Sequence, residues 1–273
     1  MKPKNVRSFP PSQPVRSGAS SRQADLKPHR SRSWLNTTEP DPIAFAEEVE
    51  TVCTLYAYTP LLQALGAPIV STDEMTGIQA LERKAPTKPL RPGLVERREF
   101  EYERHGTLSA IVSCDVGTGA VTEASLDPTR TEADFAAPIG RTLAHDPEGV
   151  WVFVVDQLNI HQSVSLVDLV AGQCGLREEV AQLRAQGGLK AMASRAAWLS
   201  DASHRIQFVY TPTHTSWLNQ IELWFSILVR RALRRGNFPS VEALRERILA
   251  FIAYWNRTAQ PFQWTYKGCP LVI

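Results

Sequence analysis

The chain has 273 residues, of which 43% are hydrophobic, enough to bury the core of one large or two modest domains. It has no apolar run long enough to span a membrane and no apolar segment like that of a secretory signal, so we expect a cytoplasmic protein. The four cysteines form no CxxC pair, which leaves a zinc site or a disulfide framework without support.

The net charge of +2 conceals an asymmetry. Residues 1–35 carry eight Lys or Arg against one acid, so this arm has a charge of +7 and the remaining 238 residues −5. Such an arm is either a solvated, disordered tail or a contact for nucleic-acid phosphates. The candidates for that contact are Arg22, Lys27, Arg30 and Arg32.

The first half of the body reads as helix followed by strands. Residues 36–66 are expected to form a helical connector, because apolar residues recur at helical spacing over 41–65 and Gly66 follows. A hairpin is expected over 69–81 with its turn at Thr76-Gly77, then an exposed, proline-rich loop over 84–98. One more strand near residue 110 would complete three antiparallel strands.

The second half alternates helices and strands. Thr131 and Asp134 indicate a helix start, and Pro138 is expected to interrupt that helix. The sequence then predicts a strand over 150–155, helices over 163–199 with a break at 187–188, and a strand over 204–212. A long helix from Thr215 to Arg235 and a last helix over 240–256, capped by Ser240, complete the pattern.

This order predicts an α/β fold with a mixed five-stranded sheet flanked by helices, its strands near residues 69, 79, 110, 153 and 208. Strands joined through helices lie parallel, and ligands bind at their carboxyl ends. Asp73 and Asp156 each follow an apolar run, "APIVST" and "VWVFVV", so we expect them to be neighbours at one sheet edge.

A third carboxylate, Glu222, lies in "TSWLNQIELWFSILVRRALRR", where helical spacing puts it on an apolar face with Leu218 and Phe225. Hydrogen bonds from Asn219 or Ser226 would partly compensate its desolvation, and a shared metal would do so more fully. Taken singly, a strand-end Asp is usually a turn former and a helical Glu is usually solvated. Together, Asp73, Asp156 and Glu222 suit two Mg²⁺ or Mn²⁺ ions and phosphoryl transfer on nucleic acid.

Several long motifs in this order resemble a bacterial DDE transposase of the IS six-thirty family, a relative of the mariner elements. They are "STDEMTGIQALER", "RPGLVERREFEYERHGT", "FVVDQLNIHQS", "VYTPTHTSWLNQIELWFSILVRRALRRGNF" and "YWNRTAQPFQWTYKG". The resemblance implies a ribonuclease-H-like fold with Asp73, Asp156 and Glu222 as catalytic and metal-binding residues. It also implies metal-dependent cleavage of double-stranded DNA at transposon ends, then attack of the freed 3′-OH on target DNA, typically at TA.

The same resemblance divides the chain. It implies a catalytic domain over 67–236 with an insert at about 172–200, followed by a C-terminal helix and tail over 237–273. Family members normally begin with helix-turn-helix modules, and "SRQADLKPHRSRSWLN" resembles only the end of that region, so we expect an N-terminally truncated chain. Met75 and Gln162 stand where relatives often have Lys. Because two DNA ends must be held together, the active complex is expected to be a homodimer.

Further residues are candidates to contact DNA or to support the carboxylates: Glu74, Asn159, His161, His214 and Asn219. The arginines Arg230, Arg231, Arg234 and Arg235 either complement the dipole of their helix or contact the DNA backbone. An alternative function is a catalytically impaired remnant that only binds DNA or another protein. A Ser/His/Asp hydrolase is not supported, because the sequence contains no GxSxG.

Overall fold

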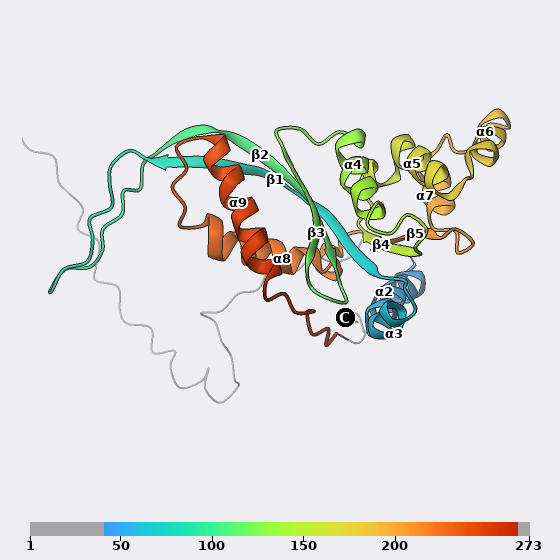
Figure 1. Ribbon diagram of the computed structural model, residues 1–273, viewed down its shortest axis with the longest axis horizontal. Helices are drawn as coiled ribbons and strands as arrows, with labels where there is room; N and C mark the ends of the chain where they lie inside the picture. The colour runs from blue at the N-terminus through green and yellow to red at the C-terminus, as the bar shows by residue number, and fades with distance from the viewer. Residues whose placement is uncertain (1–40, 267–273) are drawn as a thin grey trace, which may run out of the picture. The chain divides into compact units, whose positions relative to one another are not determined.

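The computed structural model describes residues 41–266 (Figure 1). The basic arm expected at residues 1–35 lies outside this range. No helix in the described range is long and apolar enough to cross a membrane. The elements are, in chain order, α2 (Pro42–Ala57), α3 (Thr59–Ala64), β1 (Ile69–Arg83), β2 (Tyr102–Asp115), β3 (Val121–Asp127), α4 (Glu132–Leu143), β4 (Trp151–Val155), η1 (Asn159–Gln162), α5 (Val164–Cys174), α6 (Arg177–Ala185), α7 (Met192–Leu199), β5 (Ile206–Tyr210), η2 (Ser216–Leu218), α8 (Ile221–Leu228), the π-helical η3 (Val229–Leu233) and α9 (Val241–Asn256).

The strands form one mixed sheet in the order β3-β2-β1-β4-β5. β1, β2 and β3 pair antiparallel, whereas β4 lies parallel to β1 and β5 parallel to β4. This confirms a five-stranded sheet flanked by helices, with the helix-connected strands parallel. Its central strands are apolar on both faces, as strands covered on both sides must be.

The hairpin expected over 69–81 is wrong, because β1 is a single strand of 15 residues. Gly77 does adopt a positive φ of 68°, but it lies in a register shift between Met75 and Ile78 and not in a chain reversal. β2 pairs with β1 on both sides of this bulge, so the turn chemistry bends the strand without ending it. The third antiparallel strand is therefore β3, which follows a turn at Gly119 and which the sequence reading missed.

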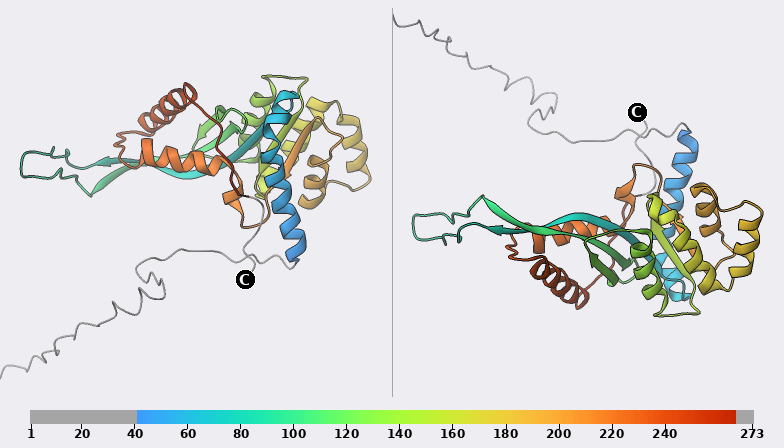
Figure 2. Two further views of the ribbon diagram at one scale, coloured as in Figure 1. Left: turned by 90° about the horizontal axis from the view of Figure 1, so that it is seen from below. Right: turned by 90° about the horizontal axis from the view of Figure 1, so that it is seen from above.

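Helices cover both faces of the sheet, as the views in Figure 2 show. On one face, Phe135 of α4, Leu166 of α5 and Trp198 of α7 pack into one cluster with Phe153 of β4. Val154, the next residue of β4, faces the other side and packs with Val52 of α2. On that same side, α8 and α9 cover the antiparallel strands through buried residues such as Trp224 and Ile248.

The helix boundaries explain two further differences from expectation. α4 begins with the predicted capping box of Thr131 and Asp134, but it continues through Pro138. Packing of the fully buried Phe135 and Ile139 offsets the backbone hydrogen bond that Pro138 cannot donate. The single helix expected from Thr215 to Arg235 is wrong: it is divided into η2, α8 and η3. The division falls at Asn219, which is extended with a ψ of 111°.

Candidate functional site

The two aspartates lie side by side on parallel neighbouring strands. Ser71 of β1 is in register with Val154 of β4, and two residues further along each strand are Asp73 and Asp156. Asp73 is 5% exposed, and the side chain of Asp156 is 34% exposed. The parallel register thus explains why two residues 83 positions apart meet at one edge of the sheet.

Asp73 is held by the start of α8 and by its own backbone. Its Oδ1 accepts a hydrogen bond of 2.8 Å from the backbone N–H of Glu74, and its Oδ2 accepts one of 3.1 Å from Nδ2 of Asn219. Burial raises the pKa of Asp73 to about 7, and the negative charge of Asp156 acts in the same direction. This carboxyl is therefore poorly solvated and close to another anion.

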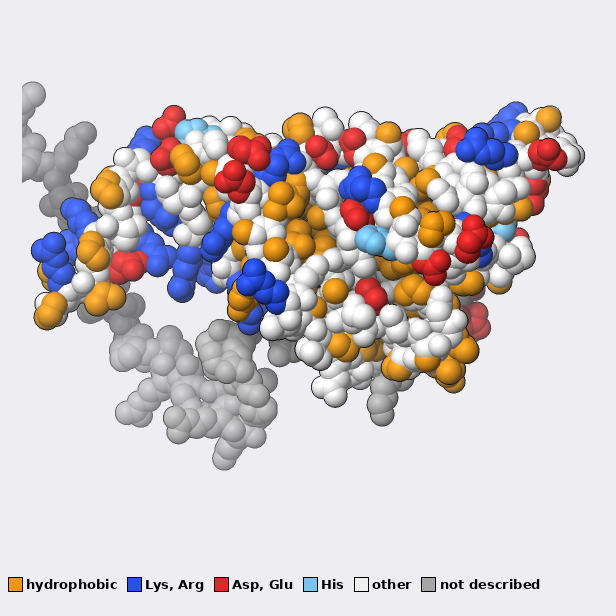
Figure 3. Space-filling view, in the orientation of Figure 1, with side chains coloured by type: hydrophobic (Ala, Val, Ile, Leu, Met, Phe, Trp, Pro, Cys, Tyr) orange, Lys and Arg blue, Asp and Glu red, His pale blue; other side chains and the backbone are white. Residues whose placement is uncertain are grey.

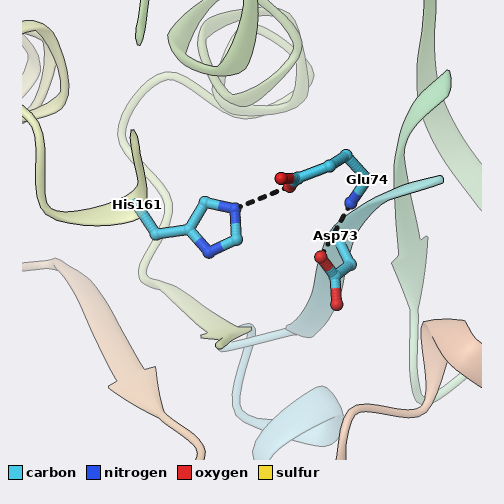
Figure 4. A group of neighbouring side chains, drawn as sticks. All are labelled: Asp73, Glu74 and His161. Carbon is cyan, nitrogen blue, oxygen red and sulfur yellow. Dashed lines mark hydrogen bonds and ion pairs between the residues drawn. The ribbon is translucent and has the colours of Figure 1, made fainter. Parts of the chain in front are cut away.

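Glu74, the next residue of β1, points to the opposite face of the sheet and contacts His161 (Figure 4). Nε2 of His161 lies 3.0 Å from Oε2 of Glu74, and Nδ1 lies 2.7 Å from Oδ1 of Asp156. The His161 side chain is fully buried and its ring lies against that of Phe135, with centroids 4.1 Å apart. The imidazole thus joins two carboxylates that come from different strands.

The charges of this bridge are coupled. Burial would lower the pKa of His161, but its hydrogen bonds to Asp156 and Glu74 and their charges raise it to about 10. For Asp156, burial opposes ionisation, but the hydrogen bond and charge of His161 prevail and lower its pKa. At neutral pH the group is an imidazolium between two carboxylates. Arg130, 3.2 Å from Oε1 of Glu74, adds a second cation.

Glu222 is in the first turn of α8, and its place depends on a buried network. The Oγ of Ser71 accepts a 2.8 Å hydrogen bond from the backbone N–H of Ile221 and donates to Oδ1 of Asn219. Burial and the charge of Asp156 both raise the pKa of Glu222, so these two anions also interact. Asn219 therefore supports Asp73, not Glu222 as the sequence suggested, because its amide is used by β1.

The three carboxylates are not equally close. Potential ligand atoms of Asp73, Glu74 and His161 all lie within 4.8 Å of one another, and neither Asp156 nor Glu222 is in that group. Glu222 instead lines a pocket of about 380 Å³ whose wall also includes Glu74 and Met75. A larger pocket of about 900 Å³, formed by α2, α3 and residues 261–266, contains none of these carboxylates.

The other candidates separate into buried and exposed residues. Gln162 is 9% exposed, and its backbone carbonyl accepts a 2.6 Å hydrogen bond from Nε of Arg195. Asn159 and His214 are exposed, and neither makes a side-chain hydrogen bond or ion pair within residues 41–266. The four candidate arginines that follow α8 are all exposed: Arg230, Arg231, Arg234 and Arg235. The candidates in the basic arm lie outside the described residues.

Two contributors were missed by the sequence reading. Ser71 lies in an apolar run and appears there as one more strand residue, although alternation along β1 puts it on the same face as Asp73. Arg130 lies in the loop before α4, and no pattern in the sequence connects it with Glu74, which is 56 residues away.

Comparison with known proteins identifies the family and the fold of the chain. Residues 68–245 match the family model described as "DDE superfamily endonuclease". The structure is similar to a pre-cleavage Mos1 transpososome, with 14% identity, a TM-score of 0.51, and coverage of 87% of this chain and 65% of that one. No match is found among curated proteins.

Two further solved structures are similar at lower scores. The Mos1 mariner paired-end complex with Mn has 16% identity and a TM-score of 0.49, and covers 86% of this chain and 63% of that one. The catalytic domain of Mos1 mariner transposase has 14% identity and a TM-score of 0.45, with 82% and 90% covered. The chain thus spans less than two thirds of the paired-end and pre-cleavage chains. The sheet and its flanking helices have the ribonuclease-H-like DDE fold.

Proposed function

The chain belongs to the DDE superfamily of endonucleases, and on that premise we propose that it is a DNA transposase. Its reaction would be metal-dependent cleavage of double-stranded DNA at transposon ends, followed by joining of the freed 3′-OH to target DNA. The preference for TA targets and membership of the IS six-thirty family follow from the sequence resemblance alone. Asp73, Asp156 and Glu222 are the proposed catalytic residues.

One observation carries the proposal: Asp156, which follows β4, is close enough to a carboxylate on β1 and to one on α8 to raise the pKa of both. The charge of Asp156 contributes to the raised pKa of both Asp73 and Glu222. A divalent cation shared by these oxygens would relieve both the burial and the repulsion, and oxygen ligands are those that Mg²⁺ and Mn²⁺ prefer. The donor set therefore fits one or two such ions, with Asp73, Asp156 and Glu222 as ligands.

When bound, such ions would activate an attacking water or hydroxyl and stabilise the leaving oxygen of a phosphodiester. The protein's own contribution is to hold three carboxylates in fixed positions before DNA arrives. Asn219 fixes Asp73 through a 3.1 Å hydrogen bond, and His161 fixes Asp156 through a 2.7 Å ion pair. Ser71 anchors the first turn of α8, which carries Glu222. Such preorganisation lowers the cost of reaching the reactive geometry.

Glu74 has a different proposed role from its neighbour Asp73. Its side chain is 3% exposed and is engaged by both His161 and Arg130. These two cations already neutralise it, so Glu74 would orient His161 and not bind metal. His161 in turn would keep Asp156 ionised, which metal binding requires.

The direct test is a nicking assay that needs no knowledge of the terminal repeats. The purified chain is incubated with a supercoiled plasmid that carries its own gene with flanking DNA, in Mg²⁺ or Mn²⁺. We expect nicking by the wild type that is lost in Asp156→Asn and Glu222→Gln but kept in Asp168→Asn, an exposed carboxylate paired with Arg184. If the wild type nicked DNA with neither Mg²⁺ nor Mn²⁺, the proposal would be contradicted, and a remnant that only binds DNA would be favoured.

A further inference from the structure

Three arginines converge on a pocket at the end of the α8 segment. The pocket has a volume of about 340 Å³, and its wall includes Arg231, Arg235 and Arg247. Arg231 lies in the π-helical η3, Arg235 lies in the turn that follows it, and Arg247 reaches the same space from α9. In Figure 3, Lys and Arg side chains gather over the β1–β2 hairpin and the neighbouring end of α8.

These arginines have no anionic partner within residues 41–266. None of the three makes an ion pair or a side-chain hydrogen bond there: on α9, Glu246 directly precedes Arg247 but forms no ion pair with it, and Glu242 pairs with Arg245 at 3.4 Å. Three like charges that line one pocket repel one another. Such a cluster is suited to an anion with several acceptor oxygens.

The floor of the pocket is fixed to the sheet. The backbone N–H of Arg83, on β1, donates a 2.7 Å hydrogen bond to Oδ1 of Asn237, and the N–H of Phe238 donates one of 2.8 Å to the carbonyl of Leu81. At Gly236 any Cβ would lie 2.1 Å from the ring of Phe238, so the chain passes there only as glycine. The turn that joins the two arginine-bearing helices is therefore held in one conformation.

We propose that this pocket binds a phosphate of the DNA backbone and sets the path of the duplex away from the carboxylates. This inference rests on the proposed function, which supplies DNA as the substrate. Arg235 is 13 residues beyond Glu222, past the rest of α8, the π-helical η3 and the start of a turn, and a rise of about 1.5 Å per residue gives roughly 20 Å as the upper limit of their separation. At about 3.4 Å per nucleotide, the bound phosphate is at most about six nucleotides from the reacting one.

The pocket separates four arginines that the sequence could not distinguish. Arg231 and Arg235 line it, whereas Arg230 and Arg234 are exposed on the same segment but are not part of its wall. Arg247, which no sequence pattern singled out, completes it. Arg230→Gln and Arg234→Gln are thus matched controls that change the net charge equally.

The test measures the affinity of the full chain for a 30-base-pair duplex of arbitrary sequence over a series of salt concentrations, in EDTA so that no cleavage occurs. Arg231→Gln, Arg235→Gln and Arg247→Gln should each weaken binding and reduce the slope of log K against log salt by about 0.9, the value for one released phosphate contact. Arg247→Lys should keep the slope, and Arg230→Gln and Arg234→Gln should change it much less.

Equal effects at all five positions would show only a diffuse positive field and overturn the proposal, as would absence of duplex binding by the wild type. Because the assay needs no metal, its result is independent of whether the chain nicks DNA. On a duplex whose cut position is mapped, a neutral methylphosphonate at one position within about six nucleotides of the cut should weaken wild-type binding and leave Arg235→Gln unaffected. An equal loss of affinity in the wild type and in Arg235→Gln at each of these positions would contradict the proposed position of the bound phosphate.

Discussion

The amide of Asn219 donates a 3.1 Å hydrogen bond to the carboxylate of Asp73, which connects the start of α8 to β1, the central strand of the sheet. The same amide donates to the carbonyl of Thr72, and its oxygen accepts from Ser71. One fully buried side chain therefore aligns β1 with the helix that carries Glu222.

Asn219→Ala should lower the free energy of unfolding by about 1–3 kcal/mol, because it leaves buried polar partners without a hydrogen bond. The measurement is urea unfolding. The control is Asn159→Ala, which removes the same group from an exposed position. A loss for Asn219→Ala no greater than for the control would show that this network is not important for stability.

The raised pKa of Asp73 has a consequence for stability in the absence of metal. The folded protein keeps this proton up to about pH 7, whereas the unfolded chain releases it near 3.8. The folded state therefore binds more protons between these values, and stability falls as pH rises from about 4 to 7. Asp73→Asn should be more stable than the wild type above pH 7, by up to about 4 kcal/mol, and equal to it near pH 4.

This difference is read from thermal unfolding in EDTA at several pH values. Asp168→Asn is the control, because that carboxylate is exposed and paired with Arg184. If the stability difference between Asp73→Asn and the wild type did not change between pH 4 and 8, the pKa of Asp73 would not be raised.

Metal binding should offset the destabilisation that the ionised carboxylate of Asp73 causes above pH 7. At pH 8, Mn²⁺ at about 100 times its Kd should stabilise the wild type by about 2.7 kcal/mol. Asp73→Asn and Asp156→Asn should lose most of this stabilisation. The affinity, measured by electron paramagnetic resonance of free Mn²⁺, should fall as pH decreases through about 7, since Asp73 then takes up a proton.

The imidazole of His161 should remain protonated well above neutral pH. Its pKa is raised to about 10 by Asp156 and Glu74, so the stability it contributes is present below about 6.5 and lost as pH rises through 10. Glu74→Gln should lower this pKa, which NMR of the imidazole protons would show. Glu82→Gln, which removes the partner of the half-exposed His105, should leave His161 unchanged.

Gly119→Ala should release the segment that follows α9. Gly119 has a φ of 72°, and a Cβ there would lie 2.0 Å from the carbonyl oxygen of Gln260. Its own carbonyl accepts a 2.8 Å hydrogen bond from Nε1 of Trp255. Backbone strain and this clash should lower stability by about 1–3 kcal/mol. Proteolysis near residue 260 should also accelerate, and normal resistance would argue against this contact.

Much of the fold could be predicted from the sequence because its signals are local. The capping residues Thr131 and Ser240 mark helix starts, and the apolar run before Asp156 predicts a buried strand. The turn at Thr76-Gly77 misled the prediction, because a glycine with positive φ suits a bulge as well as a hairpin. Only pairing with β2, a distant segment, decides between them.

The residues of the candidate site could be predicted from the sequence, but the contacts between them could not. Asp73 and Asp156 were recognised as strand-end residues, and their proximity follows from the parallel register. The bridge through His161 was not, since Glu74 lies 87 residues away and its orientation depends on the pleat of β1. Helical spacing placed Glu222 correctly beside Phe225 in α8, but it failed for Asn219, which is extended and binds β1.

The contact between Ser71 and Asn219 joins residues 148 positions apart, and this has a consequence for synthesis of the chain. At about 5–20 residues per second, a ribosome needs roughly 7–30 s to proceed from one to the other. During that time β1 is complete, but the helix that carries Glu222 does not exist. If the chain has the proposed function, it lacks Glu222 until most of it has been translated, so chains arrested before residue 219 should show no nicking at all.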